Sequence, residues 1–441
     1  MVRQRRYGPG TGHGSRAGMG PRSGAGDRGR TGARDGGAAA PVRTAVPGGT
    51  GHAAGAVPGE AAARYGPGPG RDEPERDGEQ GGDRVTAPPP VGVLGANFNG
   101  DPSELAYAEL EDIGATWLRG FYPVRDTGGT AVGDQPQIKT LLAARERGYG
   151  TVLSLKFPYN ERPLPAPGSS GMKTALARLD EVLPVVMGKT DILVIGNEPF
   201  LECRPADRGD RLNAFYEQLA RHVIDHRDRR SATGTRLYMG ALNHLDRPGG
   251  RTPATRRWLD FVRKTPAIAG VDIHPHLSAP GGARRYLEYV LPALRDDQTF
   301  LATEFSLVLL WKEHLGDPVS AKFAARYEEH RGQRVWQVIK AALDGPFTQQ
   351  KWDRFLSMSP WFDRHRTYLR DQVEQFRGTG KLAVAAYGVS QDADMASGFG
   401  VDSTPWLLNS LFCPYTVLPG KEGLPGRNRA WTDGFRSAQQ R

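Results

Sequence analysis

Two apolar runs of this sequence each lead into a glutamate. Asp191–Pro199 (DILVIGNEP) contains Glu198, and Phe300–Phe305 (FLATEF) contains Glu304. Runs of this composition are typical of buried strands, and a carboxylate at the end of a buried strand is expected only where it is used or paired. Two strands that each deliver one Glu at their C-terminal end suit glycosidic bond cleavage, which places two carboxyl groups around one bond.

The chain beyond residue 90 alternates between short apolar runs and helical patterns. One helical stripe runs through Met172, Leu179 and Val186, and Asp101-Pro102 with Glu104 is typical of a helix start. Strand–helix alternation predicts parallel strands with right-handed crossovers. The eight candidate strands are 91–97, 116–121, 151–157, 192–198, 236–243, 270–274, 299–304 and 382–389.

Eight such units most naturally close into an α/β barrel of the (β/α)8 TIM type. A doubly wound open sheet is the alternative, and it usually has a Gly-rich phosphate loop after its first strand. The first strand here reads VGVLGAN, which lacks the GxGxxG spacing of that loop. We therefore expect the barrel.

The composition divides the 441 residues into two parts. Residues 1–88 are rich in Gly, Arg, Ala and Pro, and such a segment buries too little apolar surface to fold, so we expect a disordered tail. A start codon assigned too far upstream would also produce it. Residues 89–441 are expected to form the catalytic barrel. The net charge is +9, but the tail arginines are dispersed without aromatic residues, so we expect a solvated tail and no nucleic-acid partner.

Cysteine content and hydropathy bear on the compartment. The only cysteines are Cys203 and Cys413, which form no metal-binding spacing; two free thiols are the default, and one bridge stays open. No apolar stretch has the length of a secretory signal or a membrane span. These features favour a cytoplasmic protein.

The interval between the seventh and eighth strands is oversized. Residues 311–380 contain four Trp and many basic residues, and we expect them to form an insertion on the active face. The insertion is either a lid or wall of sugar subsites, or an elaborated helix packed outside the barrel. Trp311 either stacks on a sugar or packs within the insertion.

Residues just past the C-terminal ends of barrel strands converge on one pocket. Here these positions form a ring that is unusually rich in carboxylate, amide and imidazole groups, which favours a functional site over a structural rim. The ring comprises Asn97, Asn99, Arg119, Lys156, Asn197, Glu198, Asn243, His244, His274, His276, Glu304, Tyr387, Gln391 and Asp392.

The motifs of this ring resemble those of glycoside hydrolase clan A, the retaining (β/α)8-barrel glycosidases. The resemblance rests on Asn-Glu-Pro at 197–199 after strand four, Glu304 after strand seven, Arg119 after strand two and His-Pro-His at 274–276 after strand six. It implies that Glu198 is the acid/base and Glu304 the nucleophile. The chain departs from the clan in offering Tyr387 where many members have Trp, and Lys156 where many have His.

The chemistry sets physical requirements for these residues. Glu198 must hold a proton near neutral pH, so we expect burial and the charge of Glu304 to raise its pKa. Glu304 must stay ionised, with Arg119 and either Tyr387 or His276 beside it. Asn197 is expected to bind the sugar 2-OH. Asn97, Asn243, His274, His276, Tyr387 and Trp311 complete the expected substrate contacts, and no metal or cofactor is needed.

Two other functions fit the same sequence. A metal-dependent barrel hydrolase would use His244, His274, His276 and Asp392 as ligands. A non-catalytic carbohydrate-binding barrel would instead pair Glu304 with Arg119 structurally. A carbohydrate or glycoconjugate is the expected partner in the favoured interpretation. The sugar, the linkage, exo or endo cleavage and the oligomeric state are not determined by the sequence.

Overall fold

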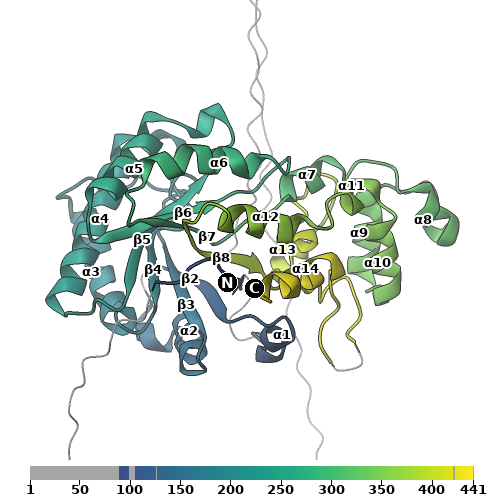
Figure 1. The fold of residues 1–441 in the computed structure, drawn as a ribbon, viewed down its shortest axis with the longest axis horizontal. Coiled ribbons are helices and arrows are strands. Elements are labelled where there is room, and N and C mark those ends of the chain that lie inside the picture. The colour runs from purple at the N-terminus through teal and green to yellow at the C-terminus, as the bar shows by residue number, and fades with distance from the viewer. Residues whose placement is uncertain (1–88, 99–104, 126, 421–422, 441) are drawn as a thin grey trace, which may run out of the picture. The chain divides into compact units, whose positions relative to one another are not determined.

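The computed structural model describes residues 89–98, 105–125, 127–420 and 423–440 (Figure 1). The expected disordered tail at 1–88, the helix start at 101–104 and Asn99 lie outside the described residues. The described strands and helices all belong to the compact unit Gly81–Arg441.

Eight parallel strands close into a barrel, which confirms the predicted fold. Each strand pairs with the next along the chain, and β1 pairs with β8. The two glutamates therefore lie just beyond strand ends, because β4 stops at Ile195 and β7 at Ala302. The strands are β1 Val93–Asn97, β2 Trp117–Pro123, β3 Gly150–Lys156, β4 Ile192–Ile195, β5 Arg236–Asn243, β6 Ile268–His274, β7 Thr299–Ala302 and β8 Leu382–Gly388.

Along each strand, side chains point in turn toward the barrel interior and toward the surrounding helices. In β4, Leu193 and Ile195 join the large core shared with the helices, whereas Ile192 and Val194 join a small apolar cluster formed mainly by strand residues. In β2 the side chain two residues past Trp117 of this inner cluster is Arg119. The strand period therefore points Arg119 inward, above the apolar layer and toward the carboxyl ends of the strands.

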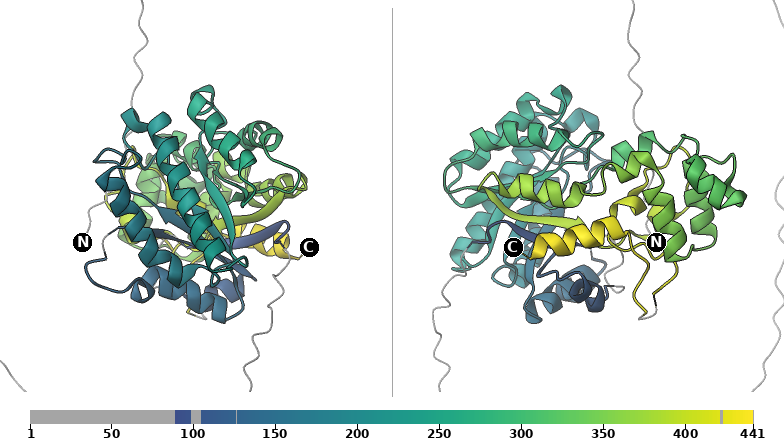
Figure 2. Two further views of the ribbon diagram at one scale, coloured as in Figure 1. Left: turned by 90° about the vertical axis from the view of Figure 1, so that its left-hand side faces the viewer. Right: turned by 45° about the vertical axis from the view of Figure 1, so that its right-hand side comes forward.

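Helices surround the strands, and the left view of Figure 2 shows α3, α4 and α5 in front of the barrel. Their starts have local causes: the Ser169 hydroxyl accepts from the backbone N–H of Met172 at the start of α3, and Thr252 and Thr255 form a capping box on α5. The helices between strands are α1 Tyr107–Asp112, α2 Pro136–Glu146, α3 Ser170–Val186, α4 Asp210–Arg229, α5 Pro253–Lys264 and α6 Gly282–Val290.

The long interval between β7 and β8 is helical. Its buried apolar side chains form part of the same core as the barrel helices. Figure 1 shows α9 and α10 next to one another, and the ring of Phe323 in α8 lies 5.5 Å from that of Phe355 in α10, centroid to centroid. The helices are α7 Val308–Glu313, α8 Ala321–Arg326, α9 Val335–Asp344, α10 Gln349–Ser357, α11 Pro360–Asp363 and α12 Tyr368–Arg377, followed after β8 by α13 Ala393–Ala396 and α14 Arg429–Gln439.

Two further expectations concern single features. Cys203 and Cys413 are both buried and free, so they do not form the bridge that the sequence left open. Among the described helices, none combines the length and the apolar character that crossing a bilayer demands.

Candidate active site

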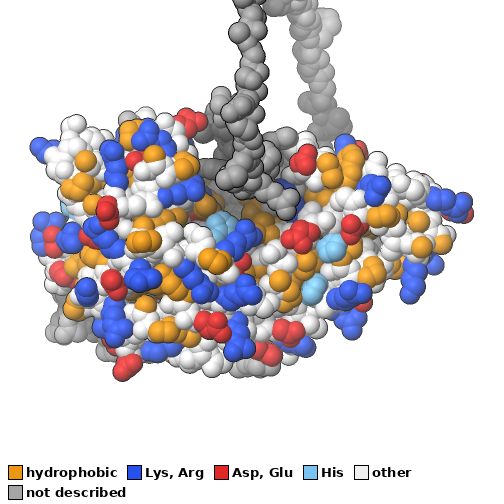
Figure 3. Space-filling view, turned by 90° about the horizontal axis from the view of Figure 1, so that it is seen from above, with side chains coloured by type: hydrophobic (Ala, Val, Ile, Leu, Met, Phe, Trp, Pro, Cys, Tyr) orange, Lys and Arg blue, Asp and Glu red, His pale blue; other side chains and the backbone are white. Residues whose placement is uncertain are grey.

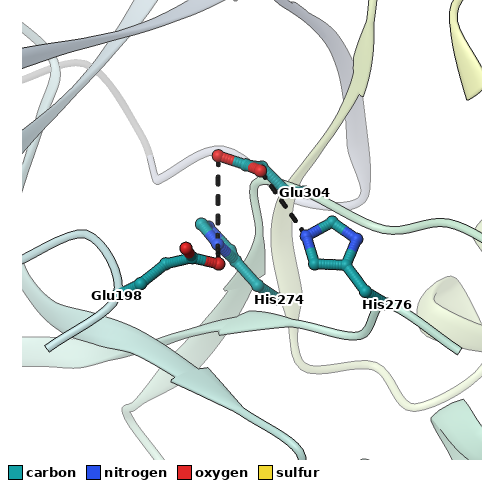
Figure 4. A group of neighbouring side chains, drawn as sticks. All are labelled: Glu198, His274, His276 and Glu304. Carbon is teal, nitrogen blue, oxygen red and sulfur yellow. Dashed lines mark hydrogen bonds and ion pairs between the residues drawn. The ribbon is translucent and has the colours of Figure 1, made fainter. Parts of the chain in front are cut away.

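The two glutamates face one another at the carboxyl ends of β4 and β7 (Figure 4). One side-chain oxygen of Glu198, one of Glu304 and one ring nitrogen each of His274 and His276 all lie within 4.8 Å of one another. The turn into Glu198 requires a glycine, because Gly196 has φ 108° and a Cβ there would lie 2.2 Å from the carbonyl oxygen of Gly240. The backbone after β4 is thus shaped to present Glu198.

Glu304 has cationic and imidazole neighbours on both oxygens. Arg119 Nη1 donates to Oε1 over 2.6 Å, and His276 Nε2 lies 3.6 Å from Oε2. Burial raises the pKa of Glu304, but the charges of His274 and Arg119 outweigh it and hold the pKa well below its usual range. Glu304 is therefore ionised, in the state that a nucleophile needs.

Arg119 joins the ends of several strands. Its guanidinium is almost fully buried and also donates to Asn97 Oδ1 (3.0 Å), Asn197 Oδ1 and Ser154 Oγ (3.2 Å). A buried cation is costly unless its donors are paired, and here each terminal nitrogen has an acceptor. This network fixes the orientation of Glu304 and of Asn197.

Glu198 is bound by an amide and an imidazole. Asn243 Nδ2 donates to Glu198 Oε1 over 2.8 Å, and His274 Nδ1 lies 3.2 Å from the same oxygen. On the far side of the ring, Thr303 Oγ donates to Asp272 and lies 2.9 Å from His274 Nε2. Because the Thr303 proton is already committed to Asp272, its oxygen accepts from Nε2–H, which assigns a proton to Nε2.

This assignment places a second proton between His274 and Glu198. With Nε2 protonated, a neutral ring would point a bare Nδ1 at Glu198 Oε1 (3.2 Å) and at Glu304 Oε1 (3.9 Å). Such a contact between acceptors is repulsive unless one proton is shared by Nδ1 and Glu198. The site thus contains one proton between His274 Nδ1 and Glu198 Oε1.

The charges of the site decide which partner holds that proton at rest. Burial raises the pKa of Glu198, but the hydrogen bond and charge of His274 lower it to about 2. Burial lowers the pKa of His274, but the charge of Glu304 and the hydrogen bonds to Asp272 and Glu198 raise it to about 10. The expected rise in the pKa of Glu198 is therefore wrong: the buried imidazolium outweighs burial and holds the proton in the resting site.

A second ion pair lies beside the glutamates. Lys156 Nζ is 3.3 Å from Glu202 Oε1, which also accepts from Asn197 Nδ2 over 3.0 Å. Burial lowers the pKa of Lys156, but the charges of Glu202, Glu198 and Glu304 raise it by more, so the ammonium stays charged. Among the described residues, the buried Oε2 of Glu202 has no hydrogen-bond partner.

Two aromatic residues predicted to contact substrate, Tyr387 and Trp311, are fully buried. The Tyr387 hydroxyl is fully buried and donates to Asn409 Oδ1 over 2.9 Å, so Tyr387 does not take the expected place beside Glu304. Trp311 is fully buried against Phe362 and Trp431, which corrects its interpretation as a sugar contact in favour of packing within the insertion.

The expected metal-ligand set is also not brought together as predicted. In the part of the chain that the structure describes, the group with metal-ligand spacing contains His274 and His276 with the two glutamates, not His244 or Asp392. His244 adopts a positive φ of 56° after β5, and Asp392 Oδ1 accepts from the backbone N–H of Asp394 at the start of α13.

Sequence reasoning missed Trp406. It begins the short 3-10 helix Trp406–Asn409, is partly exposed, and its ring lies edge-on to His276 with centroids 4.9 Å apart. A partly exposed aromatic side chain beside His276 thus comes from the loop that follows β8. The presence of a Trp in this loop was the available signal, but spacing from β8 does not reveal its position.

Comparisons with known proteins find likenesses at the level of the chain's architecture. No family model and no curated protein sequence matches. Among solved structures, a glucosidase from Croceicoccus marinus shares 12% identity over 81% of this chain and 69% of its own, with a TM-score of 0.48. The Ignisphaera aggregans GH53 catalytic domain shares 12% over 80% and 98%, with a TM-score of 0.43. An endo-1,4-beta-xylanase from Caldicellulosiruptor owensensis shares 9% over 78% and 97%, with a TM-score of 0.46. Identities and TM-scores this low assign no function to the chain.

Proposed function

We propose that this chain is a retaining glycoside hydrolase in which Glu304 is the nucleophile and Glu198 the acid/base. The observation that supports it is the placement of two carboxylates from β4 and β7 with oxygens within 4.8 Å of each other. Retaining enzymes have carboxyl groups about 5–5.5 Å apart, whereas inverting enzymes need about 6.5–9.5 Å to admit a water. The short spacing favours direct attack by a carboxylate.

In the first step, Glu304 attacks the anomeric carbon. A bond forms between that carbon and the Glu304 oxygen, the glycosidic C–O bond breaks, and the leaving oxygen takes the proton shared by Glu198 and His274. Arg119 Nη1, 2.6 Å from Oε1, holds Glu304 ionised and in place. The order of proton transfer is from Nδ1 of His274 to Glu198 and from Glu198 to the leaving group.

In the second step, water releases the sugar. Glu198 accepts a proton from the water, the water oxygen bonds to the anomeric carbon, and Glu304 leaves as a carboxylate. The returned proton again lies between Glu198 and His274, which are 3.2 Å apart. Neither step needs a metal or a cofactor.

The polar groups around the glutamates suit a sugar. Asn197 and Asn243 position Glu202 and Glu198, respectively, and can also bind hydroxyls once substrate is present. The Lys156–Glu202 pair adds one donor and the unpartnered Oε2 acceptor. Trp406 supplies an apolar ring face of the kind on which sugars stack. We propose a β-linked or arabino-type glycan or glycoconjugate as substrate.

The distribution of charge on the face shown in Figure 3 differs from that of a phosphate-binding surface. On the face shown in Figure 3, Lys and Arg side chains are interspersed with Asp and Glu rather than joined in one continuous stripe. Phosphate-tracking proteins present a contiguous basic path.

The test is a nucleophile rescue. The wild-type chain is first assayed against aryl β-glucosides, β-galactosides, β-xylosides and α-arabinofuranosides. On the best of these, Glu304→Ala should lose turnover, and added azide should restore it with a glycosyl azide of inverted anomeric configuration. Glu313→Ala, which alters an exposed glutamate at the end of α7, serves as the matched control and should keep full activity.

Two results would contradict the proposal. Full activity of Glu304→Ala would remove Glu304 from the nucleophile role. Binding of glycans without hydrolysis of any of the aryl glycosides or their parent polysaccharides would favour the non-catalytic barrel.

A further inference from the structure

We propose that the catalytic centre also binds one divalent transition-metal ion of the Zn²⁺ type, and that this ion blocks substrate. The site comprises Glu198, His274, His276 and Glu304, whose donor atoms all lie within 4.8 Å of one another (Figure 4). Two imidazoles and two carboxylates are a donor set that Zn²⁺ accepts. The inference goes beyond hydrolysis, because the proposed reaction uses no metal.

Three of the contacts between these residues can be compared with the edges of a tetrahedral zinc site. Zn–N and Zn–O bonds of about 2.0–2.1 Å imply ligand atoms about 3.3–3.4 Å apart along each edge of the tetrahedron. His274 Nδ1 lies 3.2 Å from Glu198 Oε1 and 3.9 Å from Glu304 Oε1, and His276 Nε2 lies 3.6 Å from Glu304 Oε2. The 3.2 Å contact matches that edge, whereas the other two are longer and use different oxygens of Glu304. All four donor atoms lie within 4.8 Å of one another, so the longest pairs must shorten by up to about 1.5 Å when the ion binds.

Each imidazole is already oriented as a metal ligand. A metal-binding His typically has its second ring nitrogen anchored by an oxygen, which fixes the tautomer and the ring plane. His274 Nε2 donates to Thr303 Oγ, which donates in turn to Asp272, so Nδ1 is the nitrogen that faces the carboxylates. The ion would displace the proton that Nδ1 shares with Glu198, and this proton would be released to the solvent. His276 Nδ1 lies 2.8 Å from Ser306 Oγ, which leaves Nε2 facing Glu304.

The same geometry explains why the ion would inhibit. An ion held by both glutamates occupies the space between nucleophile and acid/base, where the anomeric carbon must lie. Four protein ligands close the coordination shell, whereas catalytic zinc sites keep one position open for water or substrate. The positive charges of Arg119 and Lys156 nearby oppose a cation. We therefore expect reversible binding of an inhibitor rather than a permanent cofactor.

The experiment uses Co²⁺ and Zn²⁺ with the full-length chain after dialysis against a chelator. Co²⁺ should bind 1:1 and give the visible absorption of a four-coordinate ion, and Zn²⁺ should displace it. Under hydrolysis conditions, Zn²⁺ should raise KM in proportion to its concentration and leave kcat unchanged. The chelator-treated enzyme should be fully active.

Variants distinguish this site from surface histidines. His276→Ala should weaken Co²⁺ binding by more than about 100-fold, and Asp272→Asn, which alters the support of His274, by about 10–100-fold. His222→Ala removes the exposed His222–Asp180 pair between α4 and α3 and should leave the 1:1 binding intact. Near-ultraviolet circular dichroism of each variant checks that the fold is retained.

The possible outcomes separate the two proposals. Absence of a four-coordinate Co²⁺ spectrum, or equal binding by wild type and His276→Ala, overturns the metal site and leaves the hydrolase proposal standing. Loss of hydrolysis on chelation with recovery on adding Zn²⁺ overturns both the inhibitory role and the metal-free mechanism. Competitive inhibition that His276→Ala relieves supports the inference.

Discussion

Replacing His274 with asparagine should move the alkaline limb of the kcat/KM profile to lower pH. In the proposed mechanism, the proton donated to the leaving group belongs to the His274–Glu198 pair, and the pKa of His274 is about 10. Activity should therefore persist in alkaline solution and fall as this proton is lost. Asparagine can still donate to Glu198 but carries no titratable proton.

The size of the shift depends on the groups that remain around Glu198. The largest influences that lower its pKa, the hydrogen bond and charge of His274, disappear, while burial and the charge of Glu304 still raise it. The pKa should then lie above 4.5, near the value of about 6–7 that enzymes reach for buried catalytic glutamates. The alkaline limb would move down by about three pH units, and at pH 8.5 the variant would retain about one thirtieth of its own maximum.

The assay is kcat/KM between pH 4 and 11 on an aryl glycoside whose leaving group needs protonation. His276→Asn is the matched control, because its ring contacts Glu304 rather than Glu198, and its alkaline limb should stay near that of the wild type. An unshifted alkaline limb in His274→Asn, with activity merely lowered, would refute the shared proton and leave His274 a packing role.

Three further changes test binding and stability. Trp406→Ala should raise KM for glycan substrates about tenfold, equal to about 1.4 kcal/mol, whereas Trp336→Ala on α9 should leave KM unchanged. Asn428→Ala leaves three buried hydrogen-bonding groups without their partner and should lower the free energy of unfolding by about 3 kcal/mol or more. Asn160→Ala removes one hydrogen bond and should cost about 1 kcal/mol; urea denaturation measures both variants. Burial raises the pKa of Glu109 from 4.5 to about 7, so the free energy of unfolding of the wild type should fall as pH rises from 4.5 through 7. Glu109→Gln should be more stable than the wild type by up to about 3 kcal/mol at pH 8 and no more stable at pH 4. Thermal melts at both pH values measure this, and an equal advantage at the two would contradict it.

The fold and the central residues could be predicted because both depend on local periodicity. Continuous apolar runs at regular intervals identify buried parallel strands, and closure of the barrel then brings Glu198, Glu304 and Arg119 to the same end. No knowledge of side-chain contacts is needed for that step. The bounds of β4 and β7 differ from the predicted ones by two or three residues, since the glutamates lie past the ladder rather than within it.

The proton inventory of the site could not be predicted in this way. The state of Glu198 depends on which nitrogen of His274 is protonated, and that depends on Thr303 giving its proton to Asp272. Glu198 and Thr303 are 76 and 29 residues away from His274 in the sequence. The protonation state depends on the directions of the hydrogen-bond donors, which only the packed structure supplies. Burial, which the sequence could predict, raises the pKa of Glu198, whereas the net effect of the site lowers it.

The positions of the aromatic side chains are a second feature that the sequence does not predict. Trp311 and Tyr387 have positions in the sequence that suit a sugar contact, yet both are fully buried. Trp406 reaches His276 from a loop whose path is not set by any strand period. Large aromatic side chains in a chain of this size are more often buried in the core than exposed in a binding site, and sequence spacing alone does not distinguish the two cases.

The separate support of Trp406 has a consequence for how such a protein diversifies. The glutamates are fixed by the barrel register, whereas the segment that begins at Trp406 is held by Asn428, which donates to the carbonyls of Leu407 and Ser410. Exchange of the 389–410 segment would therefore replace the aromatic ring beside His276 without moving the two glutamates. In the proposed hydrolase, selection or design could change the preference for one sugar over another by grafting this single segment.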